Sequence, residues 1–185
     1  MTAALFGAVL TGGESLRMGR DKALIEIGGV AMVDRVGAAL ASVCADVIAV
    51  GPARLAGTLR PVKDRNAGEG PLGGLLTALD EAGQSGQRCD GVLVVACDLA
   101  WLDVSTLGRL IAAIDSDHDV VMARTDRLEP LCAIWDLRAQ ACLREWFDHG
   151  ERAVHRSLGG LAVRSVDVVA SALRNVNTPD DLRDE

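Results

Sequence analysis

Two continuous apolar runs constrain the fold of this 185-residue chain more than any other feature. They extend from Leu5 to Thr11 and from Gly91 to Cys97. A strand buried on both faces is apolar throughout rather than alternating, which is typical of central strands in a parallel sheet. Parallel neighbours need crossover connections, usually helices, so the two runs predict an α/β fold.

The segments between and after these runs complete that fold. Apolar residues at three- and four-residue spacing predict helices over Met32 to Val43, Leu72 to Ala82, Val104 to Ile114 and Leu137 to Phe147. Shorter strands are predicted over Asp46 to Val50, Val120 to Ala123, Leu131 to Trp135 and Ala162 to Val166. The alternation predicts a three-layer α/β/α sandwich with a mostly parallel, Rossmann-like sheet, in one domain covering residues 1–185.

Composition narrows the classes of partner. The chain has 26 acidic and 19 basic residues and a formal net charge of -7, which disfavours nucleic acid. The first apolar run is too short for a membrane span and has no preceding basic residues, so we expect a cytoplasmic protein without a membrane segment. Five cysteines without any C-x-x-C pair are expected to be reduced core thiols, and the three histidines lack metal-ligand spacing.

The loop after the first run carries the strongest functional signal. It reads L-T-G-G-E-S-L-R-M-G-R-D-K from Leu10 to Lys22. Gly12 and Gly13 let backbone N–H groups approach phosphate oxygens, and Arg17 and Lys22 can add charge-assisted hydrogen bonds to a polyphosphate. The spacing differs from that of a dinucleotide fingerprint, a P-loop and a nucleophile elbow.

This loop resembles the signature of the molybdenum cofactor guanylyltransferase family and its nucleotidyltransferase relatives. The resemblance covers nearly the whole chain, because four further motifs follow in the family's order. They are Gly70-Pro71-Leu72-Gly73-Gly74, Cys97-Asp98, Glu129-Pro130-Leu131 and the stretch Asn175-Val176-Asn177-Thr178-Pro179-Asp180-Asp181-Leu182. Two departures are Ala100, where the family usually has proline, and Thr11, where alanine is common and a hydroxyl is added near the expected base or ribose.

Asp98 is the candidate ligand of a Mg²⁺ cofactor. It follows the second apolar run, at the strand end where a metal bridging phosphates can sit. The alternative interpretation is a helix N-cap, which aspartate often provides. The Cys-Asp pair of the resemblance favours the metal.

The resemblance also implies three sets of site residues. The catalytic set is Arg17, Lys22 and Asp98, and the nucleotide is expected at Leu10, Thr11, Gly12, Gly13, Lys22, Asp64 and Asp98. The acceptor is expected at Asn175, Asn177 and Arg152. Structural alternatives are a turn at Asp64 and an Asx turn before a closing helix for the two asparagines.

The implied activity is transfer of GMP from GTP to the terminal phosphate of molybdopterin, in free or molybdenum-loaded form, with release of pyrophosphate. A cytidylyltransferase for the same pterin and a guanylyltransferase for another phosphorylated small molecule stay open, because the phosphate loop is shared. A nucleotide-binding protein without turnover is the alternative from a different class. The resemblance further implies a monomer with transient contacts to cofactor-delivery proteins and molybdoenzyme chaperones.

Overall fold

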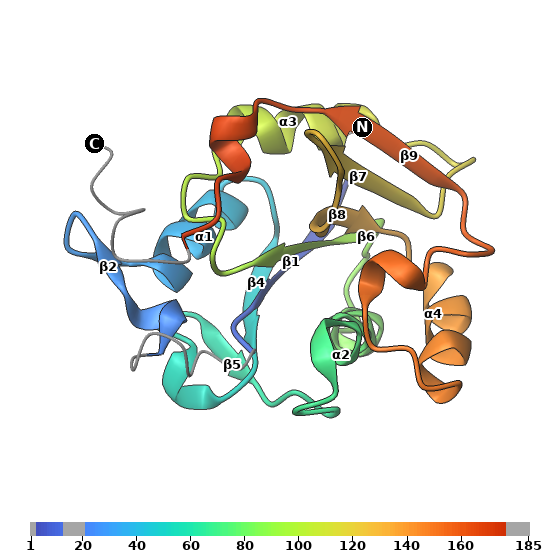
Figure 1. Ribbon diagram of the computed structural model, residues 1–185, viewed down its shortest axis with the longest axis horizontal. Helices are drawn as coiled ribbons and strands as arrows, with labels where there is room; N and C mark the ends of the chain where they lie inside the picture. Colours follow the sequence, from blue (N-terminus) through green and yellow to red (C-terminus); the bar gives the residue numbers. More distant parts are fainter. Residues whose placement is uncertain (1–2, 13–20, 177–185) are drawn as a thin grey trace.

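A seven-stranded sheet forms the centre of the computed structural model, which describes residues 3–12 and 21–176 (Figure 1). The strand order is β5-β4-β1-β6-β8-β7-β9. These strands are β1 (Leu5–Leu10), β4 (Asp46–Val50), β5 (Arg60–Val62), β6 (Gly91–Ala96), β7 (Val120–Arg124), β8 (Leu128–Trp135) and β9 (Val163–Asp167). A small second sheet pairs β2 (Glu26–Ile27) with β3 (Val30–Ala31).

The main sheet is mostly parallel, as predicted. β1 lies between β4 and β6 and runs parallel to both, with Ala8 opposite Ile48 and Val94. β8 runs antiparallel to both of its neighbours, β6 and β7, and is the one reversed strand among the seven described. The carboxyl ends of β1, β4 and β6 therefore meet at one edge of the sheet.

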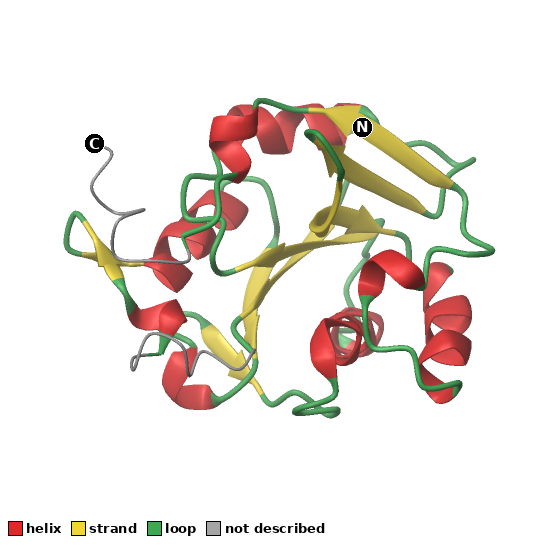
Figure 2. Ribbon diagram, viewed as in Figure 1, coloured by secondary structure: helices red, strands yellow, loops and turns green. Residues whose placement is uncertain are grey.

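Helices cover both faces and make three layers (Figure 2). Leu5 and Val9 of β1 belong to the core that includes α1 (Met32–Ala41) and α3 (Val104–Ala112). Phe6 and Ala8, which point to the opposite face, belong to the core that includes α2 (Gly70–Gln84) and α4 (Ala139–Asp148). The continuous apolar character of β1 thus follows from burial on both sides.

The helix that begins at Gly70 starts two residues before the predicted range. Gly70 has φ +76°, and a Cβ atom there would lie 3.0 Å from the carbonyl oxygen of Arg152. Glycine is therefore required by both backbone conformation and space. Pro71 follows in the first turn, where its missing N–H is not needed.

All five thiols are free, as predicted, but only Cys97 and Cys132 are buried in the core, and the other three are half-buried. Burial is the main cause that raises the pKa of Cys97 and Cys132 to about 12, so both thiols are protonated at neutral pH. In the part of the chain that the structure describes, no helix has the length and apolar character needed to cross a membrane.

Candidate active site

Two cavities lie side by side at the carboxyl edge of the sheet. The smaller cavity, of about 420 Å³, lies at the ends of β1 and β4. The larger cavity, of about 690 Å³, lies between the end of β6 and the β7–β8 hairpin. Pro71, in the first turn of α2, lines both. Two compartments that adjoin at a helix N-terminus can hold two ligands with their anionic ends in contact.

The smaller cavity brings together three of the predicted nucleotide residues, Leu10, Gly12 and Asp64. Gly74 of α2 also lines it, and a Cβ there would meet only the side chains of Leu10 and Asp64, at 3.5 and 3.9 Å. The absence of a side chain at Gly74 leaves room between α2 and the end of β1. This wall of the cavity suits a ligand that approaches the backbone closely.

Thr11 is buried and makes a structural hydrogen bond. Its side chain is 5% exposed, and its hydroxyl donates a hydrogen bond to the carbonyl oxygen of Val50 at 3.1 Å. Gly51 has φ +147°, and a Cβ atom there would lie 2.4 Å from the Thr11 hydroxyl. This hydrogen bond ties β1 to β4. The predicted position of the hydroxyl beside the base or ribose stays a prediction.

Asp64 forms the predicted turn and also lines the smaller cavity. Its Oδ1 accepts a hydrogen bond from the backbone N–H of Asn66 at 2.9 Å, as in an Asx turn. The buried hydroxyl of Thr77 lies 3.0 Å from the same oxygen. These contacts fix the carboxylate while it lines the smaller cavity.

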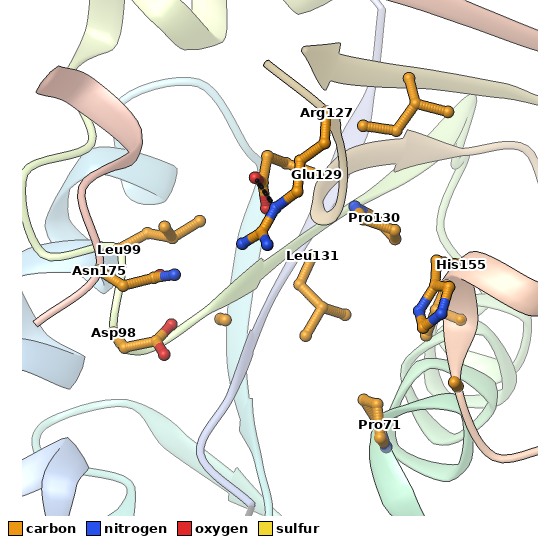
Figure 3. A pocket seen from close by; sticks show the side chains of 13 residues that line it. Pro71, Asp98, Leu99, Arg127, Glu129, Pro130, Leu131, His155 and Asn175 are labelled. Atoms are coloured by element: carbon orange, nitrogen blue, oxygen red, sulfur yellow. Dashed lines mark hydrogen bonds and ion pairs between the residues drawn. The ribbon is translucent and has the colours of Figure 1, made fainter. Parts of the chain in front are cut away.

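Asp98 stands at the end of β6 and lines the larger cavity (Figure 3). The ammonium group of Lys22 lies 2.9 Å from its Oδ2, and the two side chains are 17% and 25% exposed. Asp98 is not the N-cap of the next helix. Asp103 caps α3 instead, by accepting a hydrogen bond from Thr106 N–H at 2.6 Å. The capping alternative for Asp98 is thereby removed.

The segment that carries Asn175 returns to the loop after β6. Val176 is fully buried, and its N–H donates to the carbonyl oxygen of Asp98 at 3.1 Å. This pairing places Asn175 at the wall of the larger cavity, with its amide directed into the space (Figure 3). Two motifs that are more than 70 positions apart in the sequence thus meet around one cavity.

Trp101 fastens this returning segment. The guanidinium groups of Arg35 and Arg174 both lie over its ring, with central carbons 5.3 and 5.1 Å from the ring centroid. Arg35 Nε also donates to the carbonyl oxygen of Ala100 at 3.3 Å. The loop that carries alanine in place of the usual proline is therefore held by an arginine and a tryptophan.

The sequence is similar to a family of known proteins over most of its length. The model of the MobA-like NTP transferase domain matches residues 7–163. The chain belongs to this family. It is 34% identical to a probable molybdenum cofactor guanylyltransferase of Opitutus terrae, over 96% of this chain and 93% of that protein. It is 31% identical to the molybdenum cofactor guanylyltransferase of Rhodobacter capsulatus, over 95% and 92% of the two chains.

Solved structures agree with the family fold. A putative protein from Aquifex aeolicus superposes with a TM-score of 0.76 at 25% identity, over 94% of this chain and 93% of that one. Molybdopterin-guanine dinucleotide biosynthesis protein A from Archaeoglobus fulgidus superposes with a TM-score of 0.74 at 23% identity, over 96% and 95%. The chain is therefore a nucleotidyltransferase of the MobA-like family, with that family's α/β architecture.

Arg152 is the predicted acceptor residue that the structure places elsewhere. Its Nη1 donates to the carbonyl oxygen of Phe147 at 2.7 Å, its guanidinium lies over the Phe147 ring at 4.2 Å, and its Nε contacts Glu69. It lines neither of the two cavities. The structure thus gives Arg152 a role in joining α4 to α2. Gly13, Arg17 and Asn177 lie outside the described residues, as does the predicted closing helix.

Several cavity residues escaped the sequence analysis. Lys63 lines the smaller cavity, and Arg127 and His155 line the larger one (Figure 3). Lys63 and Lys22 are the only lysines of the chain, a signal that could have drawn attention to Lys63. Arg127 and His155 belong to no motif with a fixed spacing, so their position depends on the fold of the β7–β8 hairpin and of the segment after α4.

Replacing Thr77 by valine tests the support of Asp64 in this MobA-like site. Valine keeps the shape but removes the hydroxyl that contacts Asp64, so we expect a stability loss of about 1 kcal/mol and weaker nucleotide binding. Both changes are measurable by urea unfolding and by calorimetric titration with GTP. The serine variant keeps the hydroxyl and should bind GTP as the wild type does. Equal GTP affinity of the valine variant would contradict this role.

Replacing Trp101 by leucine tests the fastening of Asn175. The two cation–π contacts are lost, which should lower stability by about 1–3 kcal/mol and raise the KM for the acceptor. The Kd for GTP should stay unchanged, because the smaller cavity does not contain this segment. The phenylalanine variant retains an aromatic ring at this position and should recover most acceptor binding. An equal loss of GTP affinity would show that the substitution disturbs the whole site and not only the segment of Asn175.

Proposed function

We propose that this protein transfers GMP from GTP to the terminal phosphate of molybdopterin, forming molybdopterin guanine dinucleotide and pyrophosphate. The observation that carries the proposal is the pair of adjoining cavities, because such a transferase holds two substrates at once with their phosphates in contact. The relatives named molybdenum cofactor guanylyltransferase suggest which two substrates these are.

GTP is assigned to the smaller cavity and the acceptor to the larger one. The smaller cavity joins backbone at Gly12 to the carboxylate of Asp64, which can accept hydrogen bonds from a ribose or a base. It follows directly on β1, and the loop with Gly13 and Arg17 leaves from the same strand end. The larger cavity has mainly apolar walls and Asp98 at one side, which suits a heterocycle with a phosphate.

Asp98 is proposed to hold a Mg²⁺ ion together with the triphosphate. Among the residues described, no group of three or more His, Cys, Asp or Glu side chains could form a metal cage. Magnesium is usually bound by one or two carboxylates, substrate phosphates and water, so a single partly exposed aspartate fits it. When bound, the ion neutralises the charge that develops on the phosphates.

The residues of the chain contribute alignment and charge. Lys22 donates to the phosphates, Gly12 N–H cradles them, and Asn175 orients the acceptor. The terminal phosphate of the acceptor attacks the α-phosphorus in line and needs no general base, because it is already ionised at neutral pH. No covalent enzyme intermediate is required, and the protonated thiol of Cys97 is not a nucleophile at this pH.

The proposal is tested by pyrophosphate release from GTP and from CTP in parallel, with and without molybdopterin. We expect release that requires GTP, Mg²⁺ and molybdopterin together. Faster release with CTP would reassign the protein as a cytidylyltransferase. Tight binding of GTP without release would favour a nucleotide-binding protein without turnover.

A further inference from the structure

The β7–β8 hairpin places a second carboxylate on the larger cavity. Five consecutive residues, 127–131, line this wall. Glu129 and Asp98 are the two carboxylates among all the lining residues, and they face the space from different elements (Figure 3). Around Glu129 the wall is apolar, with Leu128, Pro130 and Leu131. A carboxylate in an apolar wall is costly unless a partner or a ligand satisfies it.

Arg127 donates a hydrogen bond to only one of the two carboxylate oxygens of Glu129. Its Nε donates to Oε1 at 2.9 Å, while Oε2 makes no hydrogen bond with the described residues. The Glu129 side chain is 19% exposed and that of Arg127 is 74% exposed. A carboxylate accepts at both oxygens, so Glu129, which lines the cavity, can also accept from a ligand there.

The chemistry of this wall fits a flat heterocycle with N–H donors on one edge. Apolar side chains can contact the faces of such a ring, and a carboxylate can accept from adjacent ring N–H and amino groups. We propose that Glu129 selects the acceptor by accepting hydrogen bonds from the 2-amino and ring N–H groups of a 2-aminopyrimidinone, the edge that a pterin presents. This inference rests on the proposed function, in which the acceptor is a pterin.

Guanine presents the same pair of donors, so the nucleotide base is a second source of this chemistry. Glu129 lines the larger cavity and not the smaller one, which holds Leu10, Gly12 and Asp64. The position of Glu129 therefore favours the acceptor over the base of GTP.

The test compares the binding of pterin with that of lumazine, in which oxygen replaces the 2-amino group. The Kd of each compound is measured from its own fluorescence. The wild type should prefer pterin by about 10-fold or more, the effect of a hydrogen bond to a charged group. Glu129→Gln should lose this preference, because its carboxamide can donate to the oxygen of lumazine. The matched control is Asp126→Asn, which removes the same charge from an exposed residue of the same turn and should retain the preference.

Turnover separates this inference from the proposed function. With molybdopterin as acceptor, Glu129→Gln should raise the KM for the acceptor about 10-fold and leave the KM for GTP unchanged. Wild-type turnover combined with an unchanged acceptor KM and probe preference in Glu129→Gln would overturn the role of Glu129 alone. A wild type that prefers pterin but shows no molybdopterin-dependent turnover would overturn the proposed function alone.

Two further outcomes would also overturn the inference. Wild-type protein that binds neither probe, or both equally, would show that the cavity does not recognise the 2-amino group. A change in the preference for GTP over ITP in Glu129→Gln, without a change for pterin over lumazine, would assign the carboxylate to the guanine base.

Discussion

Asn in place of Asp98 is expected to lower the rate of nucleotidyl transfer by about 100- to 1,000-fold. The amide can still accept a hydrogen bond from Lys22, but it lacks the charge that is proposed to hold Mg²⁺ and that balances the ammonium group 2.9 Å away. The measurement is pyrophosphate release at saturating GTP over a range of Mg²⁺ concentrations. Because the change keeps the size of the side chain, the far-ultraviolet circular dichroism spectrum and the Tm should stay close to those of the wild type.

Asp103→Asn is the matched control for this prediction. It makes the same chemical change five positions later, at the N-cap of α3, where asparagine caps as well as aspartate. Its turnover and Mg²⁺ dependence should equal those of the wild type. Wild-type turnover in Asp98→Asn would remove this carboxylate from the reaction and with it the proposed magnesium site.

Glutamine in place of Lys22 should lower kcat/KM for GTP by about 100-fold. The ammonium group is partly buried beside Asp98, so it can reach a phosphate that arrives between the two cavities. Glutamine has nearly the same length and can donate a hydrogen bond, but it cannot neutralise the charge on the transferred phosphorus. The loss should therefore appear in single-turnover rates more than in the Kd for GTP.

The control for the lysine removes a positive charge elsewhere. Arg60 on β5 pairs with Asp46 at 2.8 Å, and its side chain is 51% exposed. Arg60→Gln should leave kcat/KM for GTP unchanged, since surface ion pairs contribute little. Equal losses in the two variants would show that net charge, rather than the position of Lys22, controls the rate.

The central strands were predictable because a strand that is buried on both faces has a continuously apolar sequence. β4 was predicted with its observed bounds, and β1 and β6 to within one residue. β5 was missed because Arg60 and Pro61 are exposed on an edge strand of three residues. The hairpin of β2 and β3 was missed too, although Gly28 and Gly29 between its strands are a turn signal.

The direction of β8 could not be predicted from its pattern. The sequence of a buried strand is apolar in either direction, and Glu129 with Pro130 concealed its first three residues. The direction of this strand determines one wall of the larger cavity, because it brings the β7–β8 hairpin to the side of Asp98. The motif Glu129-Pro130-Leu131 was recognised in the sequence, but its position in the cavity wall, and that of Arg127, depends on this strand direction.

The nucleotide side was more predictable than the acceptor side. Leu10, Gly12 and Asp64 were selected for the nucleotide and line the smaller cavity. Of the residues selected for the acceptor, Asn175 lines the larger cavity. Arg152 was selected by the same means, yet it packs on Phe147. Phosphate binding depends on glycines and cations at fixed local spacing, whereas the acceptor cavity is assembled from elements far apart in the sequence.

The central claim is that the α-phosphorus of GTP is transferred to a pterin phosphate, and isotopic labelling tests it most directly. GTP labelled at the α-phosphorus and GTP labelled at the γ-phosphorus are incubated separately with protein, Mg²⁺ and molybdopterin, and the products are separated. We predict that the α label appears in molybdopterin guanine dinucleotide and the γ label in pyrophosphate. Transfer of the γ label to the acceptor, or release of the γ label as inorganic phosphate, would contradict the account.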